Sequence, residues 1–377
     1  MVDYIECYTE YLEFEKTIRF LIKILNLSIL RLKFLHGYEK YILPVLQTYS
    51  LISTVFTFVY YDRDVMLFGL NTMTIVAILQ LLSKTFSTVI NSNELNELFL
   101  FIQEVHQAHE IDFITNSVRI HFTWILRITK IVLRFFLIPV WCITAAAFTV
   151  YCAYCDILLL GIPGIFPKSM EISYMSLFQH VHQFFLLSQI AFSVVIGDVI
   201  LLTFGLYFVA ITNVFSHTIR SLENSELSHI TKALLHIQKF HCKLLKNYQL
   251  LNEVFGYVFT IQTATSVVFI LFIFYFIQNE ETLVFFPLFL TVITQFGVFC
   301  VFGEFLYSKT EEIDIELYQS KWYEFDIKDQ KMLLLMMCMA KRPFGIRAAG
   351  MYDINLIMFI QVIKAGISFC AILYTFA

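Results

Sequence analysis

The sequence predicts an all-α membrane protein with seven transmembrane helices. Of its 377 residues, 58% are apolar and only 15% are charged, and the mean hydropathy is +0.72. The chain also holds 41 Phe, more aromatic volume than a single soluble core of this size requires. Apolar runs of spanning length recur along the chain, and basic residues gather in every second connection between them.

Seven stretches qualify as spans, because a helix of about 20 apolar residues crosses the hydrocarbon core. They cover residues 41–60, 65–83, 131–153, 184–215, 254–277, 283–306 and about 355 to the end. The fourth holds about 30 residues, which measure about 45 Å as a helix, so we expect it to protrude from the bilayer. Asp62-Arg63-Asp64 indicates a tight turn after the first span. Gly161-Ile162-Pro163-Gly164 indicates another after the third.

Helical stripes continue outside these spans. In the N-terminal segment 1–40, Ile18, Leu21, Ile22 and Leu25 follow a helical spacing, which predicts an amphipathic helix at the membrane interface. This segment is too acidic for a secretory signal peptide. Two further stripes predict helices that extend beyond the bilayer within 84–130 and 215–253. They are Leu95, Leu98, Ile102 and Val105, and Leu234, Ile237, His241 and Leu244.

The distribution of Lys and Arg predicts the orientation. Segments 1–40, 84–130, 215–253 and 307–349 hold 22 of the 26 basic residues, whereas the opposite connections hold only Arg63 and Lys168. The positive-inside rule therefore places the N-terminus in the cytoplasm and the C-terminus outside. This orientation is opposite to that of G-protein-coupled receptors. The one glycosylation sequon, which starts at Asn26, falls on the cytoplasmic side, so we expect it to be unused.

No catalytic motif is present: the chain has no P-loop, HExxH, GxSxG or GxGxxG. We therefore expect no enzyme, no cofactor and no nucleic-acid partner. His180 and His182 lack a third metal ligand nearby, which favours polar groups at the membrane interface over a metal site. Cys152 and Cys155 form a CxxC spacing, which we interpret as two packed thiols rather than a redox pair.

Asp198 lies in the middle of the fourth span. A carboxylate there costs roughly 2.5–3.5 kcal/mol on insertion scales, so it must face protein or water. Two interpretations stay open from the sequence. Asp198 is either a buried hydrogen-bonding residue that fixes helix packing, or a polar relay near a ligand cavity.

The C-terminal part of the chain carries the most specific pattern. Leu317-Tyr318-Gln319-Ser320-Lys321-Trp322-Tyr323 precedes an apolar run at 332–339 and the basic break Lys341-Arg342-Pro343. The last span continues with Leu356, Phe359, Ile363, Lys364, Ser368-Phe369 and Leu373. This order resembles the C-terminal signature of the insect odorant receptors. The related gustatory receptors carry Thr-Tyr and Gln-Phe where this chain has Ser, Phe and Thr, which favours the odorant branch.

The resemblance implies a function. It implies a tuning subunit that binds small, volatile, apolar molecules and assembles with a co-receptor into a heterotetrameric, non-selective cation channel. The location would be the plasma membrane of a sensory neuron. The extensions 84–130, 215–253 and 307–349 would form an anchor region between subunits. The alternatives are a gustatory-type channel without a co-receptor and, less favoured because no internal repeat is visible, a secondary transporter.

Candidate ligand-binding residues occupy the outer halves of spans two, three, four and six. There, aromatic residues alternate with small polar ones, which suits an apolar cavity with few polar anchors, although each aromatic could instead face lipid or core. The resemblance places the odorant site at this level. The candidates are Phe68, Asn71, Thr72, Thr144, Ala147, Phe148, Tyr151, Phe178, His182, Phe185, Phe286, Phe289 and Thr294.

Candidate pore residues lie on the last helix, 350–377. Ile372 and Phe376 are four apart and share one helix face, which around a symmetry axis would form an apolar gate that closes by dewetting. Ordinary helix packing is the alternative. Lys364, Ser368 and Thr375 complete the candidate set. Lys364 either borders the inner vestibule, or reaches toward the cytoplasm or a carboxylate.

Overall fold

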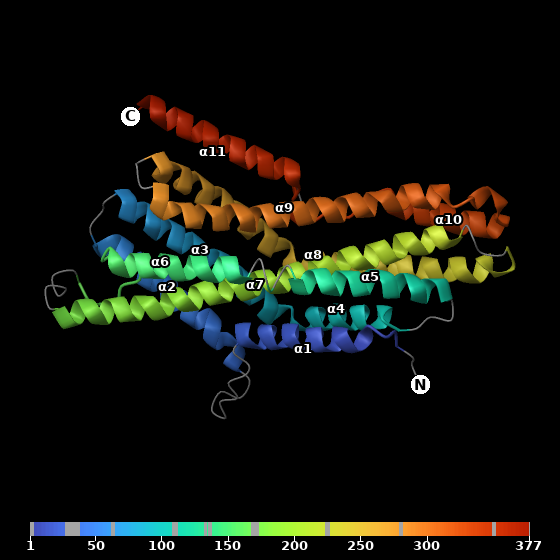
Figure 1. Ribbon diagram of the computed structural model, residues 1–377, viewed down its shortest axis with the longest axis horizontal. Helices are drawn as coiled ribbons and strands as arrows, with labels where there is room; N and C mark the ends of the chain where they lie inside the picture. Colours follow the sequence, from blue (N-terminus) through green and yellow to red (C-terminus); the bar gives the residue numbers. More distant parts are fainter. Residues whose placement is uncertain are drawn as a thin grey trace.

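The fold is an elongated bundle of long helices, seen in a computed structural model (Figure 1). Three helices, α7, α8 and α9, run along most of its length and carry the shorter helices on their sides. The structure describes residues 4–26, 38–61, 65–107, 112–131, 134, 138–166, 173–222, 227–278, 282–348 and 352–376.

The helices in the first part of the chain are comparatively short. They are α1 (Tyr8–Leu25), a 3-10 turn η1 (Tyr38–Tyr41), α2 (Ile42–Tyr60), α3 (Val65–Ile90), α4 (Ser92–Val105), α5 (Asp112–Ile131) and α6 (Ile138–Tyr154). The later helices are longer. They are α7 (Ser173–Ser221), α8 (Leu227–Gln278) and α9 (Thr282–Gln319), followed by η5 (Trp322–Glu324), α10 (Ile327–Ala340), β1 (Arg347–Ala348), β2 (Tyr352–Asp353) and α11 (Leu356–Phe376).

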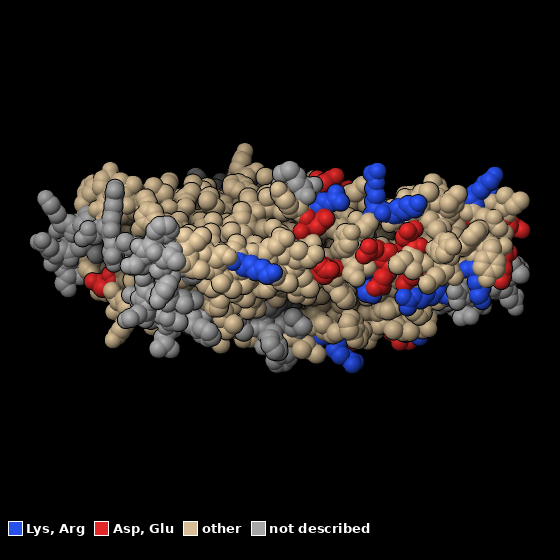
Figure 2. All heavy atoms as spheres, turned by 90° about the horizontal axis from the view of Figure 1, so that it is seen from above, with Lys and Arg blue, Asp and Glu red and all other residues tan. Residues whose placement is uncertain are grey.

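One half of the bundle, which we call the apolar half, has the composition of a membrane domain. Among the described residues, five helices are long and apolar enough to cross a bilayer. These helices are 38–60, 66–90, 174–221, 230–276 and 289–324. The shorter apolar helices α6 and α11 lie beside them. Lys, Arg, Asp and Glu gather on the opposite half of the face shown in Figure 2.

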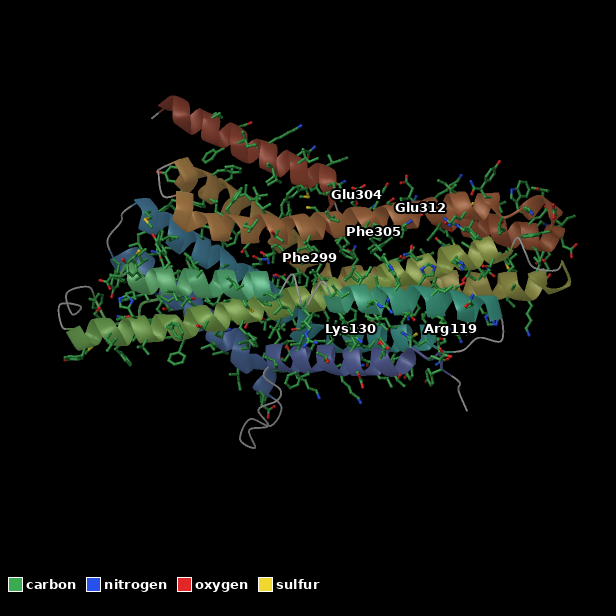
Figure 3. The ribbon with its side chains drawn as sticks, in the orientation of Figure 1. Arg119, Lys130, Phe299, Glu304, Phe305 and Glu312 are labelled. Atoms are coloured by element: carbon green, nitrogen blue, oxygen red, sulfur yellow. The ribbon has the colours of Figure 1, made fainter. Side chains whose placement is uncertain are left out.

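The other half, which we call the charged half, contains α1, α4, α5, α10 and the adjoining ends of α7, α8 and α9. The expected stripes at Leu98 and Leu234 are fully buried in it. The stripe of α1 packs against neighbouring helices, with Ile18 and Leu25 buried. Charge pairs tie these helices together, as in Lys130 with Glu10 at 3.3 Å (Figure 3).

The C-terminal helix α11 is joined closely to α9 at its start. A Cβ added at Gly303 would lie 2.0 Å from the Ile354 carbonyl oxygen, so only glycine allows this approach. The Leu356 N–H donates to Glu304 at 3.4 Å, at the position labelled in Figure 3. Farther along α11, Phe359 packs on Phe296 with ring centroids 5.6 Å apart.

The outward face of α11 has no covering within the described part of the chain. Ile357 is 62% exposed and Ile372 is 54% exposed, and Lys364 and Ser368 are exposed as well. The side chains of Thr375 and Phe376 lie outside the described residues.

Candidate functional site

A cavity of about 170 Å³ lies inside the apolar half, between five helices. For comparison, an apolar cavity of about 150 Å³ can hold a benzene molecule. Its walls come from α3, α6, α7, α8 and α9. The lining residues are Leu70, Met73, Thr74, Ala77, Phe148, Thr149, Leu187, Ile190, Ala191, Val194, Val195, Asp198, Phe269, Thr291 and Gln295.

Small side chains at two positions of the wall leave room for the cavity. Ala77 on α3 and Ala191 on α7 leave a gap that Phe148 on α6 and Phe269 on α8 border from other sides. Apolar atoms dominate this lining, which is typical of sites for small organic molecules. The few polar groups therefore decide how a ligand is oriented.

One boundary of the cavity is formed by a buried ion pair. The Asp198 carboxylate on α7 accepts a hydrogen bond from the Lys84 ammonium on α3, and their side chains are 0% and 2% exposed. Gln295 on α9 donates its amide to the second carboxylate oxygen at 2.5 Å. Three helices are thus joined at one carboxylate. Asp198 is therefore a buried hydrogen-bonding residue that joins helices, and it also lines the cavity.

Gly197 makes this pair possible. A Cβ at this position would lie 2.9 Å from Cδ of Lys84 and 3.4 Å from its Cβ. The aliphatic stem of the lysine therefore passes directly over the backbone of α7, and its ammonium reaches the next residue, Asp198. Such paired burial is how charged groups are tolerated at membrane depth.

Of the predicted ligand-binding residues, the structure places Phe148 in the cavity wall. Three predicted aromatics, Phe68, Phe178 and Phe185, are instead exposed on the outside of the bundle, Phe185 at 67%. On α3, α7 and α9, the residues that line the cavity lie about one to three helical turns C-terminal to most of the predicted residues. The cavity is therefore nearer the middle of the spans. Its lining there is mostly aliphatic.

The other predicted residues whose side chains the structure describes do not line the cavity. His182 bonds the Tyr49 hydroxyl at 2.9 Å and the Leu160 carbonyl at 3.1 Å, which ties α2 to the loop before α7. Thr72 and Thr294 donate to carbonyls of their own helices. Asn71 is buried, whereas Ala147, Tyr151 and Phe289 lie nearer the surface. The side chains of Thr144 and Phe286 lie outside the described residues.

The two histidines that could suggest a metal site have separate partners. His180 contacts Asp156 at 2.6 Å, while His182 points to different partners. Among the residues that the structure describes, no three His, Cys, Asp or Glu side chains are placed to hold a metal ion. Cys152 is a buried free thiol and Cys155 an exposed one.

The comparisons with known proteins identify the family. A family model described as "7tm Odorant receptor" matches residues 64–366, well over half of the chain. The chain belongs to this odorant receptor family. The family assignment agrees with the order of the C-terminal residues and with an all-α membrane protein of seven spans.

Three curated odorant receptors of Drosophila melanogaster are similar in part. Odorant receptor 30a is 25% identical over 175 residues, which cover 45% of this chain and 46% of the relative. Odorant receptor 49a is 33% identical over 78 residues, covering 21% and 20%, and odorant receptor 67c is 24% identical over 145 residues, covering 38% and 36%. Each match thus spans less than half the length of these odorant receptors.

The fold is similar to that of a solved odorant receptor along almost its whole length. The insect olfactory receptor OR5 from Machilis hrabei, without ligand, gives a TM-score of 0.82 at 14% identity and covers 98% of this chain and 99% of its own. The same receptor in complex with eugenol gives 0.81 at 14%, covering 98% and 100%. At this identity the likeness establishes the fold.

The partner of Asp198 was not predicted from the sequence of this odorant receptor. The sequence pattern places Lys84 at the start of the predicted cytoplasmic segment 84–130, among the basic residues that set orientation. The structure continues α3 to Ile90 and buries Lys84 against Asp198, so this lysine lies inside the bundle. The asymmetry of the remaining Lys and Arg residues is unaffected. One signal could have indicated this pair: Lys84 and Asp198 each lie within or at the end of an apolar run, where an unpaired charge is costly.

Proposed function

We propose that this chain is the tuning subunit of an odorant-gated, non-selective cation channel. The observation that carries this proposal is the apolar cavity between five helices of a chain in the odorant receptor family. A volatile molecule that fits the cavity would change the packing of α3, α7 and α9. It would bias α11, which rests on α8 and α9, toward an open arrangement.

The proposal includes an orientation and a partner. The charged half lies in the cytoplasm, as the basic residues favour, and anchors one subunit to the next. The exposed apolar face of α11 supports a channel lined by several subunits, because Ile357 and Ile372 are more than half exposed in the single chain. The partner that we propose is the family's co-receptor, in a heterotetramer in the plasma membrane of a sensory neuron.

The first prediction concerns the cavity wall and tests this function. In cells that express the chain with the co-receptor, Phe148→Ala should shift the odorant rank order toward longer molecules, because the truncated side chain enlarges the cavity. Ala191→Phe should abolish the response by filling it. We expect wild-type ligands of about 10 heavy atoms, at roughly 0.6–0.8 kcal/mol each, to bind with Kd values from tens of micromolar down to about 1 µM. Whole-cell currents across an odorant panel measure both changes.

Phe185→Ala is the matched control. It removes the same ring from a position that is 67% exposed, so the rank order should stay as in the wild type. Surface labelling excludes loss of expression as the cause of any change. Wild-type tuning in both Phe148→Ala and Ala191→Phe would show that odorants act elsewhere.

The second prediction concerns the gate that we propose on α11. Ile372→Ala and Phe376→Ala should each raise ligand-independent current or change the permeability ratios, because a less apolar constriction dewets less readily. Ile357→Ala is the control, since Ile357 is similarly exposed at the opposite end of the same helix. Basal current and permeability ratios can be recorded in the same patches. If neither gate variant differs from the wild type in either quantity, Ile372 and Phe376 do not form the gate.

A further inference from the structure

The polar boundary of the cavity presents hydrogen-bond acceptors. The Lys84 ammonium donates to one oxygen of Asp198 and the Gln295 amide donates to the other. Thr74, a third polar lining residue, donates its hydroxyl to the Leu70 carbonyl at 2.8 Å. The described donor hydrogen bonds of these residues thus go to protein atoms, and the other two polar lining residues, Thr149 and Thr291, have partners of their own.

Asp198, Gln295 and Thr74 keep unused lone pairs that can accept a hydrogen bond from a ligand. A carboxylate offers about four acceptor positions, and the two described donors leave part of them unused. The amide oxygen of Gln295 and the hydroxyl oxygen of Thr74 are also acceptors. Lys84 itself is not among the residues that line the cavity, whereas Asp198, which accepts from its ammonium, is. A ligand therefore meets the acceptor side of the ion pair.

We propose that this cavity selects neutral molecules that carry a hydroxyl group, such as alcohols, over molecules of equal size that carry only acceptors. This inference rests on the proposed function, and it adds the chemical class of the ligand. A hydroxyl donates to Asp198 and leaves its apolar remainder against Phe148 and the aliphatic wall. A ketone or ether oxygen would face other lone pairs and gain no bond.

Protonated amines are excluded by the charge balance. Asp198 is already neutralised by Lys84, so the pair is neutral overall. A second ammonium beside the same carboxylate would bring an uncompensated charge into an apolar space and would lie close to the lysine. The donor must therefore be uncharged.

The test compares matched ligand series on the complete receptor with its co-receptor. The probes are the primary alcohols from pentanol to nonanol, the methyl ketones of the same chain lengths and the corresponding primary amines. At the best chain length, the alcohol should act at a concentration about tenfold or more below that of its ketone and its amine, as expected for one hydrogen bond to a charged group. A ketone or amine that acts at or below the alcohol concentration would overturn the proposal.

A charge-free variant tests the residues themselves. Lys84→Gln with Asp198→Asn replaces the ion pair by two amides of similar size, and an Asn amide offers donors as well as acceptors. The alcohol-to-ketone preference should fall to about threefold or less, since a ketone then finds a donor. Phe148→Ala is the control, because it should change the preferred chain length and keep the preference for alcohols. An unchanged preference in the charge-free variant would overturn the role of Asp198.

Binding to the purified receptor separates this inference from the channel function. Stabilisation against heat by each probe reports binding whether or not current flows. If alcohols stabilise the receptor more than ketones do but no probe gives a current, the preference for alcohols is supported and the channel function is contradicted. Currents or stabilisation without preference for alcohols would contradict the inference alone, and no stabilisation by any probe would contradict the cavity as a ligand site.

Discussion

Replacing Asp198 alone by alanine is expected to destabilise the receptor by about 3–5 kcal/mol and to remove most of it from the cell surface. The reason is that Lys84, which is 2% exposed, would be left as an unpaired buried charge. Lys84→Ala should have a similar effect through the isolated carboxylate. Thermal unfolding of the purified protein and surface labelling measure the two consequences.

The double replacement decides whether pairing is the cause. Lys84→Met with Asp198→Leu removes both charges and keeps apolar volume, so most of the lost stability should return. The exposed pair Lys243–Glu104 is the control, because both side chains are about half exposed and such a pair contributes less than about 1 kcal/mol. A double variant as unstable as Asp198→Ala, or an Asp198→Ala protein as stable as the wild type, would contradict the role of the ion pair.

The chain expressed without a co-receptor is expected to give little or no cation current. Lys364 is exposed on α11, and on a helix it lies about 80° from Ile372, only partly off the proposed gate face. In a tetramer of four copies, four ammonium groups would stand at one depth. At an effective dielectric of about 20 and a separation of about 10 Å, each adjacent pair costs roughly 1.7 kcal/mol, and four pairs about 7 kcal/mol before screening.

A tetramer with one copy of this chain and three copies of a partner lacking the lysine avoids that repulsion. Lys364→Gln should therefore raise homomeric assembly or cation current, whereas Lys364→Arg, which keeps the charge, should not. Native gel migration and whole-cell recording without co-receptor provide the measurements. Robust cation current from the unaltered chain alone would refute the electrostatic explanation, as would a Lys364→Gln chain with unchanged assembly and current.

The helices of the apolar half were predictable because long apolar runs admit few other structures in a membrane. The stripes around Leu98 and Leu234 likewise predicted helices beyond the bilayer. The continuity of α8 over 52 residues was harder to see, because charged residues between the apolar positions resemble a loop boundary although they do not interrupt a helix. The same ambiguity placed Lys84 at a membrane boundary.

The cavity was less predictable than the fold. Aromatic density pointed to the outer ends of the spans, but an aromatic such as Phe185 is equally suited to contact lipid, and no periodicity distinguishes the two. The cavity is instead created by small residues such as Ala77 and Ala191, which carry no chemical signal in a sequence. The partner of Asp198 is 114 positions away in the chain, so only the packing of α3 on α7 reveals it.

The central claim is that this chain is a channel subunit whose charged half anchors it in the cytoplasm, and the orientation of the chain tests that most directly. An epitope tag before Met1 should be accessible only after permeabilisation, and a tag after Ala377 should be accessible on intact cells. A tag after Gly164, in the loop between α6 and α7, should also be accessible from outside. Antibody labelling of the Met1 tag on intact cells, with the Ala377 tag protected, would contradict the account.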